Sequence, residues 1–343
     1  MKISVLDCTL RDGGCANDFR FPADTMRGVA DSIVSSDIEY IELGYLDSAK
    51  GKAKESSRFI SMQAVTDTFG PRDPNGLYTR LVMVDYGKFD PAYLPQRSAE
   101  TTDGIRFCFH KKDASKALQE AAAIASKGYE IFIQPMLTTR YTDLEFARLI
   151  EDAQRLIPSF SALYIVDSFG EMDVRSVIKR VELADKVMGD SKLIGLHTHN
   201  NLGLCFAHAQ AVSTMLLSHD LIIDGTLMGM GKGAGNLPTE RVASYLNGAY
   251  SYYYDTARLE EAARKYIEPL ASECFWGDSD EYRLSAEYSV TPTYIKMIMR
   301  KLSPDIGTLE KIISQIPDDR RDAFDADFAR ILCEKFCPAK EGC

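Results

Sequence analysis

The chain has 343 residues, 45% hydrophobic and 26% charged, which is the composition of a globular protein with a sizeable core. Its formal net charge of −10 argues against nucleic acid or an anionic membrane surface as the main partner. No run approaches the roughly 18 apolar residues of a membrane-spanning helix, so no membrane segment is expected. Asp7 interrupts the apolar start of the chain, which is therefore not the pattern of a signal peptide.

Eight cysteines are scattered along the chain, and none forms a Cys-x2-Cys pair. Cys333, Cys337 and Cys343 lie near the tail, but their spacing is not that of a zinc site and no histidine is near them in the sequence. This usage indicates reduced thiols, and we therefore expect a cytoplasmic protein.

The first 250 residues alternate short apolar runs with longer stretches of helical periodicity. Eight strands are predicted, at residues 3–8, 40–43, 78–84, 105–109, 131–134, 163–166, 193–197 and 221–223. Helices are predicted between most of them, at residues 24–36, 113–126, 143–156, 174–187, 206–217 and 238–248, several of which begin at a capping residue. This succession predicts an α/β protein with a (β/α)8 TIM barrel. A doubly wound sheet fits less well, because no Gly-x-Gly-x-x-Gly turn follows the first strand.

From about Asp255 the pattern changes to helices without intervening strands. We predict helices at residues 266–274, 291–302, 306–315 and 322–336. The expected organisation is a catalytic TIM barrel over residues 1–250, followed by a helical C-terminal region over residues 251–343.

Two motifs about 185 residues apart each follow a predicted strand. Leu10-Arg11-Asp12-Gly13-Gly14 comes after the first strand, and His197-Thr198-His199-Asn200 ends the seventh. Alternate side chains of a strand share a face, so His197 and His199 point the same way, about 6–7 Å apart along the backbone. Two imidazoles and a carboxylate such as Asp12 can share a metal ion, and Arg11 adds a fixed positive charge beside it.

Other polar residues follow further strands, where the active sites of such barrels form. Glu42 closes the second strand, and Asn236 lies in the glycine-rich loop Gly229–Glu240 after the eighth. The loop is not a P-loop, because glycine follows Lys232 where Ser or Thr would be needed. It is either a flexible flap over the barrel or a place where Lys232 contacts an anionic group. Asp167–Gly170, after the sixth strand, either lines the pocket or caps the next helix.

Together these motifs make the chain similar to the DRE-TIM metallolyase superfamily. The superfamily includes hydroxymethylglutaryl-CoA lyase, isopropylmalate and homocitrate synthases, the carboxyltransferase domain of pyruvate carboxylase and 4-hydroxy-2-oxovalerate aldolase. The resemblance covers about residues 3–250, and the combination of motifs is highly specific. The stretch Asp224–Asn236 is most similar to the aldolase branch, and Thr291–Tyr294 resembles the helical C-terminal region of those aldolases.

The resemblance implies a divalent metal ion, Mn2+ or Mg2+, held by Asp12, His197 and His199, with Asn236 beside it as a further ligand and water in the remaining positions. A 2-oxo acid would chelate this metal through its carboxylate and keto oxygens. Cleavage of the C3–C4 bond of a 4-hydroxy-2-oxo acid then leaves an enolate of pyruvate, which the metal and Arg11 stabilise.

The resemblance also implies roles for two further residues. Glu42 matches an acid that orients the arginine or a metal-bound water. Cys15 stands where the aldolases usually place a histidine that acts as the base on the 4-hydroxyl group. A thiol serves as a base only if its pKa is lowered, so the sequence leaves Cys15, Tyr45, Asp18 and a metal-bound hydroxide as alternatives.

We therefore predict a metal-dependent aldolase, a carbon–carbon lyase, that acts on a small 2-oxo acid. One alternative is an acyl-CoA-dependent condensing enzyme of the isopropylmalate or homocitrate synthase kind. The other is a catalytically degenerate barrel that serves as a partner subunit, which the histidine missing at Cys15 motivates and the intact metal ligands argue against. The resemblance also suggests an aldehyde dehydrogenase partner, and the helical tail suggests a homo-oligomer; no residue in the sequence identifies either.

Overall fold

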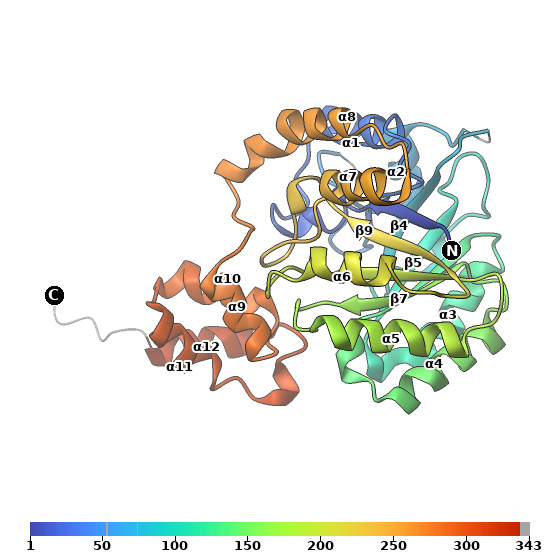
Figure 1. Ribbon diagram of the computed structural model, residues 1–343. Helices are drawn as coiled ribbons and strands as arrows, with labels where there is room; N and C mark the ends of the chain where they lie inside the picture. Colours follow the sequence, from blue (N-terminus) through green and yellow to red (C-terminus); the bar gives the residue numbers. More distant parts are fainter. Residues whose placement is uncertain (53, 74, 337–343) are drawn as a thin grey trace.

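The computed structural model describes residues 1–52, 54–73 and 75–336 (Figure 1). Cys337, Cys343 and the rest of the last seven residues of the predicted C-terminal region lie outside the described residues. The strands are β1 Ile3–Asp7, β2 Tyr40–Leu46, β3 Arg58–Phe59, β4 Thr79–Asp85, β5 Gly104–Phe109, β6 Glu130–Pro135, β7 Ala162–Asp167, β8 Leu193–Thr198 and β9 Asp220–Gly225. The helices are α1 Ala23–Val34, α2 Met62–Phe69, α3 Ala114–Ala125, α4 Asp143–Leu156, α5 Val174–Val187, α6 Cys205–Ser213, α7 Thr239–Tyr250, α8 Thr256–Ala262, α9 Asp280–Glu287, α10 Pro292–Leu302, α11 Ile306–Ile313 and α12 Ala326–Phe336.

The strands form one parallel sheet that closes on itself. Their order is β1-β9-β8-β7-β6-β5-β4-β2-β3, and β1 also pairs with β2. Eight strands therefore make a closed barrel, and the short β3 adds to the edge of β2. All eight predicted strands are present, and the predicted TIM barrel with C-terminal helices is confirmed.

The six helices predicted within the barrel are present as α1 and α3–α7. Two of them, Asp143–Leu156 and Val174–Val187, begin and end at the predicted residues. α2 was not predicted. The third unit differs, because residues 86–103, all of which are described, contain a single 3-10 turn at Pro91–Tyr93 in place of an α-helix. None of the described helices is long and apolar enough to cross a bilayer.

The C-terminal helices divide between two cores. α8 lies along the barrel beside α1 and α7, whereas α9–α12 group together on one side of it (Figure 1). The helix predicted at residues 266–274 is wrong: a π-turn at Ala263–Ile267 runs into a 3-10 turn at Glu268–Ser272. Pro269 in that turn has no backbone N–H for a continuing α-helix. α9 was not predicted either.

The barrel interior is filled by side chains from alternate strand positions. On β5, Ile105 and Phe107 pack against the helices, so Arg106 between them points inward. Gly195 on β8 leaves room for the ring of Tyr164, since a methyl group there would lie 2.4 Å from the ring. The interior is therefore a packed core, and open space for a ligand is confined to its rim.

Candidate active site and metal centre

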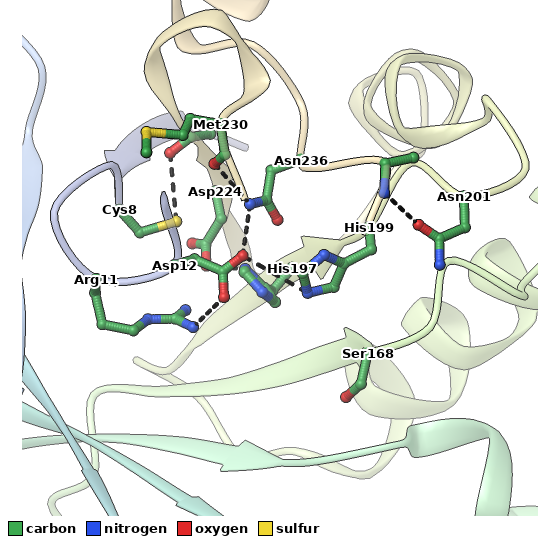
Figure 2. A network of polar contacts seen from close by, with 12 residues as sticks. Cys8, Arg11, Asp12, Ser168, His197, His199, Asn201, Asp224, Met230 and Asn236 are labelled. Carbon is green, nitrogen blue, oxygen red and sulfur yellow. Dashed lines mark hydrogen bonds and ion pairs between the residues drawn. The ribbon is translucent and has the colours of Figure 1, made fainter. Parts of the chain in front are cut away.

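Asp12, His197 and His199 meet at the carboxyl ends of β1 and β8 (Figure 2). One ligand atom from each lies within 4.8 Å of the others, and all three side chains are buried. The His197 and His199 rings stand perpendicular to each other with centroids 5.2 Å apart. The structure thus brings together the three residues predicted from the two motifs.

Two neighbours hold the carboxylate of Asp12 in place. Arg11 Nη1 donates to Oδ1 at 2.6 Å, and Asn236 Nδ2 donates to Oδ2 at 2.6 Å. Burial alone would raise the pKa of Asp12, but the positive charge of Arg11 and the hydrogen bond from Asn236 help to hold it well below its usual range. Asp12 is therefore ionised at neutral pH, as a metal ligand must be.

The two histidines present nitrogen atoms suited to a metal. His197 Nδ1 lies 2.8 Å from Asp224 Oδ2, which leaves Nε2 facing the centre. His199 Nε2 lies 3.7 Å from Asp12 Oδ2, outside hydrogen-bonding distance. Burial lowers the pKa of His199 to about 4, so this imidazole is neutral at pH 7 and its lone pair is available.

The donor set fits a divalent cation. One carboxylate and two imidazoles form a ligand set common to Mn2+ and other divalent metals. Asn236 Oδ1 is buried and has no hydrogen-bond partner among the described residues, so the amide can add an oxygen ligand. A second group of ligand-type atoms, from Cys8, His197 and Asp224, has other partners. The Cys8 thiol bonds to the Gly225 carbonyl, and burial raises its pKa well above the usual value.

Arg106 connects the two halves of the site from inside the barrel. Its side chain is fully buried and donates through Nη1 to Glu42 Oε2 at 2.7 Å and through Nη2 to Asp224 Oδ2. Glu42 Oε2 also accepts from Arg11 Nε at 2.7 Å, while Asp224 orients His197. The predicted link between Glu42 and Arg11 is thus present, and a carboxylate–histidine pair of the kind that orients metal ligands stands behind it.

The segment after β8 and the glycine-rich loop are hydrogen-bonded to each other. Asn201 Oδ1 accepts from the Ala234 backbone N–H at 2.8 Å, and the Asn200 N–H donates to the Gly235 carbonyl at 2.8 Å. Gly231 lies so close to the site that a methyl group there would come within 2.2 Å of Asn236 Nδ2. The glycine-rich loop is therefore a packed wall of the site.

Cys15 lies beside this centre but does not have the chemistry of a base. Burial raises the pKa of its thiol to about 12, with Asp12 acting in the same direction, so the thiol stays protonated at neutral pH. Asp18 is exposed and lines a separate pocket on the outside. Tyr45 faces the mouth of the barrel in a cluster with Phe19 and Met83.

Asp85 is a carboxylate that sequence reasoning missed. It ends β4 and pairs in register with Cys108 of β5. Burial raises its pKa, against hydrogen bonds from Tyr45 and Cys108 and the charge of Arg11. The signal in the sequence is an acidic residue directly after the apolar run of a strand, the same signal that identified Glu42.

Arg106 and Asp224 were also missed as parts of the site, although Asp224 opens the stretch similar to the aldolases. Arg106 is charged in the middle of an apolar strand, which is a usable signal for a barrel interior or a functional site. Its partners could not be read from the sequence, because Asp224 is 118 positions away.

Comparison with known proteins finds relatives among lyases and aldolases. The HMGL-like family model matches residues 100–264. The chain is 27% identical to the oxaloacetate decarboxylase of Mycobacterium tuberculosis over 76% of this chain and 75% of that protein. It is also 27% identical to the 4-hydroxy-2-oxovalerate aldolase of Thermus thermophilus, over 88% of this chain and 86% of that one.

Among solved structures, the N-terminal domain of a Bacteroides vulgatus protein superposes with a TM-score of 0.73 at 22% identity, covering 85% of this chain and 95% of that domain. This likeness shows the fold. The chain thus carries an HMGL-like domain of the DRE-TIM type and is an enzyme of the metal-dependent aldolase and lyase kind, as its motifs predicted.

Proposed function

We propose that the protein is a divalent-metal-dependent aldolase that cleaves or forms the C3–C4 bond of a 4-hydroxy-2-oxo acid through an enolate of pyruvate. The observation that carries the proposal is the buried group of Asp12, His197 and His199 with Arg11 beside it. These three residues, with Asn236, would hold Mn2+ or Mg2+. When bound, such a cation polarises the 2-oxo group of the substrate.

Arg11 is suited to stabilise the oxygen on which charge develops. Its Nη1 and Nε are used by Asp12 and Glu42, while Nη2 is buried and has no partner in the described part of the chain. That N–H can donate to the enolate oxygen of the substrate. In a water-poor site, loss of one such preorganised donor costs roughly a hundredfold to a thousandfold in rate.

Proton transfer on the aldehyde side we assign to Asp85, with Tyr45 hydrogen-bonded to it. In the cleavage direction Asp85 takes the proton of the 4-hydroxyl group. The C3–C4 bond then breaks, the aldehyde leaves, and C3 of the enolate takes a proton from solvent to give pyruvate, while Asp85 returns its proton to solvent. The raised pKa of Asp85 brings it closer to the working pH, which favours general-base catalysis.

Decarboxylation of a 2-oxo acid that carries a carboxylate on C3 is a second candidate. It is favoured by the protonated thiol of Cys15, because loss of CO2 gives the same enolate without any base on a hydroxyl group. One relative of the chain is named for such a reaction.

Exchange of the methyl protons of pyruvate for deuterium tests the shared step. We expect NMR in D2O to show exchange that needs Mn2+ or Mg2+ and falls at least a hundredfold in Asp12→Asn, together with metal affinity. Exchange at the wild-type rate in this variant would contradict the proposal. If metal binds but pyruvate does not exchange, release of free thiol from acetyl-CoA in the presence of 2-oxo acids would identify the condensing-enzyme alternative, and its absence the degenerate barrel.

A further inference from the structure

A small pocket lies beside the metal centre, between the mouth of the barrel and the C-terminal helices. Its volume is about 220 Å3, and its walls include His110, Ser168, Phe169, Lys232 and Thr293. Sites for drug-sized ligands have roughly 300–1,000 Å3. This pocket therefore suits a short chemical group, such as the far end of a small substrate.

Two of the residues that line the pocket, Lys232 and Ser168, are next in the chain to residues that contact the metal centre. Gly231, the neighbour of Lys232, lies so close to Asp12 that a methyl group on it would be 3.1 Å from Oδ2. Asp167, the neighbour of Ser168, accepts a hydrogen bond from the backbone N–H of His199 at 3.2 Å. A substrate whose 2-oxo acid end is held at Asp12 and His199 can therefore extend its other end into this pocket.

Lys232 gives the pocket a positive charge that no side chain of the described residues neutralises directly. Its ammonium group lies 5.5 Å from the centre of the Phe169 ring, and it forms no ion pair with a carboxylate in residues 1–52, 54–73 or 75–336. Burial lowers the pKa of Lys232, while Cys15, Asp12 and Asp85 act in the opposite direction from a distance. Lys232 is partly buried, and removing a cation from water is costly unless an anion joins it.

The nearby acidic groups have other partners. Asp12 is bound by Arg11 and Asn236. Asp322, on the pocket wall, accepts from Arg140 Nε at 2.9 Å. The Ser168 hydroxyl accepts from the Leu137 N–H at 3.2 Å, which leaves its own proton free to donate into the pocket.

We propose that this pocket binds an anionic group on the aldehyde half of the substrate, with Lys232 as its counter-ion and Ser168 as a hydrogen-bond donor. The substrate is then a 4-hydroxy-2-oxo acid with a second acidic group, a carboxylate or a phosphate, at its far end. This inference rests on the proposed aldolase function and adds the class of aldehyde to it. A charge-assisted hydrogen bond in this partly open pocket favours the charged substrate over a neutral one.

The test is the rate of condensation with pyruvate for matched aldehydes in the metal-loaded protein. One pair is succinic semialdehyde and its methyl ester, and the other is glyceraldehyde 3-phosphate and glyceraldehyde. We expect kcat/KM to favour the charged member of at least one pair by tenfold or more, and the pair that does so identifies carboxylate or phosphate. This preference should fall about tenfold in Lys232→Gln and be largely restored in Lys232→Arg.

Lys192→Gln is the matched control, because Lys192 also lies over a phenylalanine ring, Phe160 at 4.8 Å, but precedes β8 at the opposite end of the barrel. The preference should be unchanged in this variant. A wild-type protein without preference for either charged aldehyde, or an equal preference in Lys232→Gln, would overturn the proposal.

Titration calorimetry with succinate and with inorganic phosphate tests the anion pocket independently of the aldolase function. Binding that weakens about tenfold in Lys232→Gln, in a protein that does not exchange pyruvate protons, would support the anion pocket and reject the aldolase. Pyruvate exchange in a protein whose Lys232→Gln variant binds both anions like the wild type would support the enolate chemistry and reject the anion pocket.

Discussion

Arg106 carries a positive charge to a place where two carboxylates would otherwise face each other in a closed barrel. Removing one member of such a buried group costs about 3–5 kcal/mol, because the remaining charges lose their partner. Asp224 would also lose the contact that holds it against His197, and loss of such supporting contacts weakens metal binding about 10- to 100-fold.

We therefore expect Arg106→Met to lower the free energy of unfolding in urea by about 3–5 kcal/mol and the Mn2+ affinity, measured by calorimetry, by about 10- to 100-fold. Arg80→Met is the control, since Arg80 is also buried but donates to the Gly70 and Pro71 carbonyls away from the metal centre. That variant should lose stability and keep its metal affinity. Equal affinity in Arg106→Met and the wild type would show that Arg106 has no part in orienting His197.

Asp85 provides a second prediction at this scale. Asp85→Asn removes a carboxylate that can accept a proton, and general-base catalysis contributes about 10²- to 10⁴-fold. Cleavage of 4-hydroxy-2-oxo acids should fall by that factor in steady-state assays, with Mn2+ affinity unchanged. Decarboxylation of oxaloacetate should be spared, because that step needs no base on a hydroxyl group. Full aldol cleavage in the variant would move the base to another residue.

At the scale of elements, the glycine-rich loop depends on backbone shapes that only glycine adopts easily. Gly235 has φ +86°, and a methyl group on it would lie 2.0 Å from the Gly229 carbonyl oxygen. We expect Gly235→Ala to destabilise the protein by more than about 1 kcal/mol and to weaken metal binding through Asn236. Gly248→Ala, in helix α7 with nothing within 4 Å, should instead stabilise by about 0.5–1 kcal/mol. Chemical denaturation of the pair checks both signs.

The elements that local patterns specify were predictable from the sequence. α4 has a complete capping box from Thr142 and Glu145, and α5 has Asp173 as its N-cap, so the first residue of each helix was predictable. The β-bulge in β2 was not predictable from the sequence. It occurs at Gly44, whose φ is +150°, and it allows Glu42 and Tyr45, three positions apart, both to face the barrel interior.

The residues of the active site also fall into a group that was predictable from the sequence and a group that was not. Asp12, His197 and His199 were predictable because each lies in a short motif at a strand end, and barrel geometry brings such ends to one rim. The acids Asp85 and Asp224 gain their environment only when strands far apart in the chain close the barrel. The burial that raises the pKa of Cys15 also has no local signal.

For the whole molecule, we expect the free energy of unfolding to depend on pH, because the carboxyl group of Asp7 is buried. Burial raises its pKa to about 7, although Thr239 and Thr9 donate hydrogen bonds to it. In the unfolded chain an aspartic acid titrates near pH 4. Between about pH 4 and about pH 7 the folded protein keeps a proton that the unfolded chain releases, so stability falls as the pH rises through this range.

We expect the free energy of unfolding of the wild type, relative to Asp7→Asn, to fall by at most about 4 kcal/mol from pH 4 to pH 7, measured by urea titration at each pH. Below about pH 4 and above about pH 7 the difference should be constant. Other titrating groups, such as Asp167, are common to both proteins and cancel in the difference. A difference that rises with pH would mean that Asp7 is ionised in the folded state.

Ala234 of the glycine-rich loop is buried in the core formed by α9–α12, together with Tyr294 and Ile298. Trp276 Nε1, in the segment before α9, donates to the Met228 carbonyl at 3.1 Å. The loop that carries Lys232 and Asn236 therefore reaches its final shape only after the last helices have left the ribosome. During synthesis the eight strands can pair well before that point, so a nascent chain would hold a closed barrel whose active site matures late.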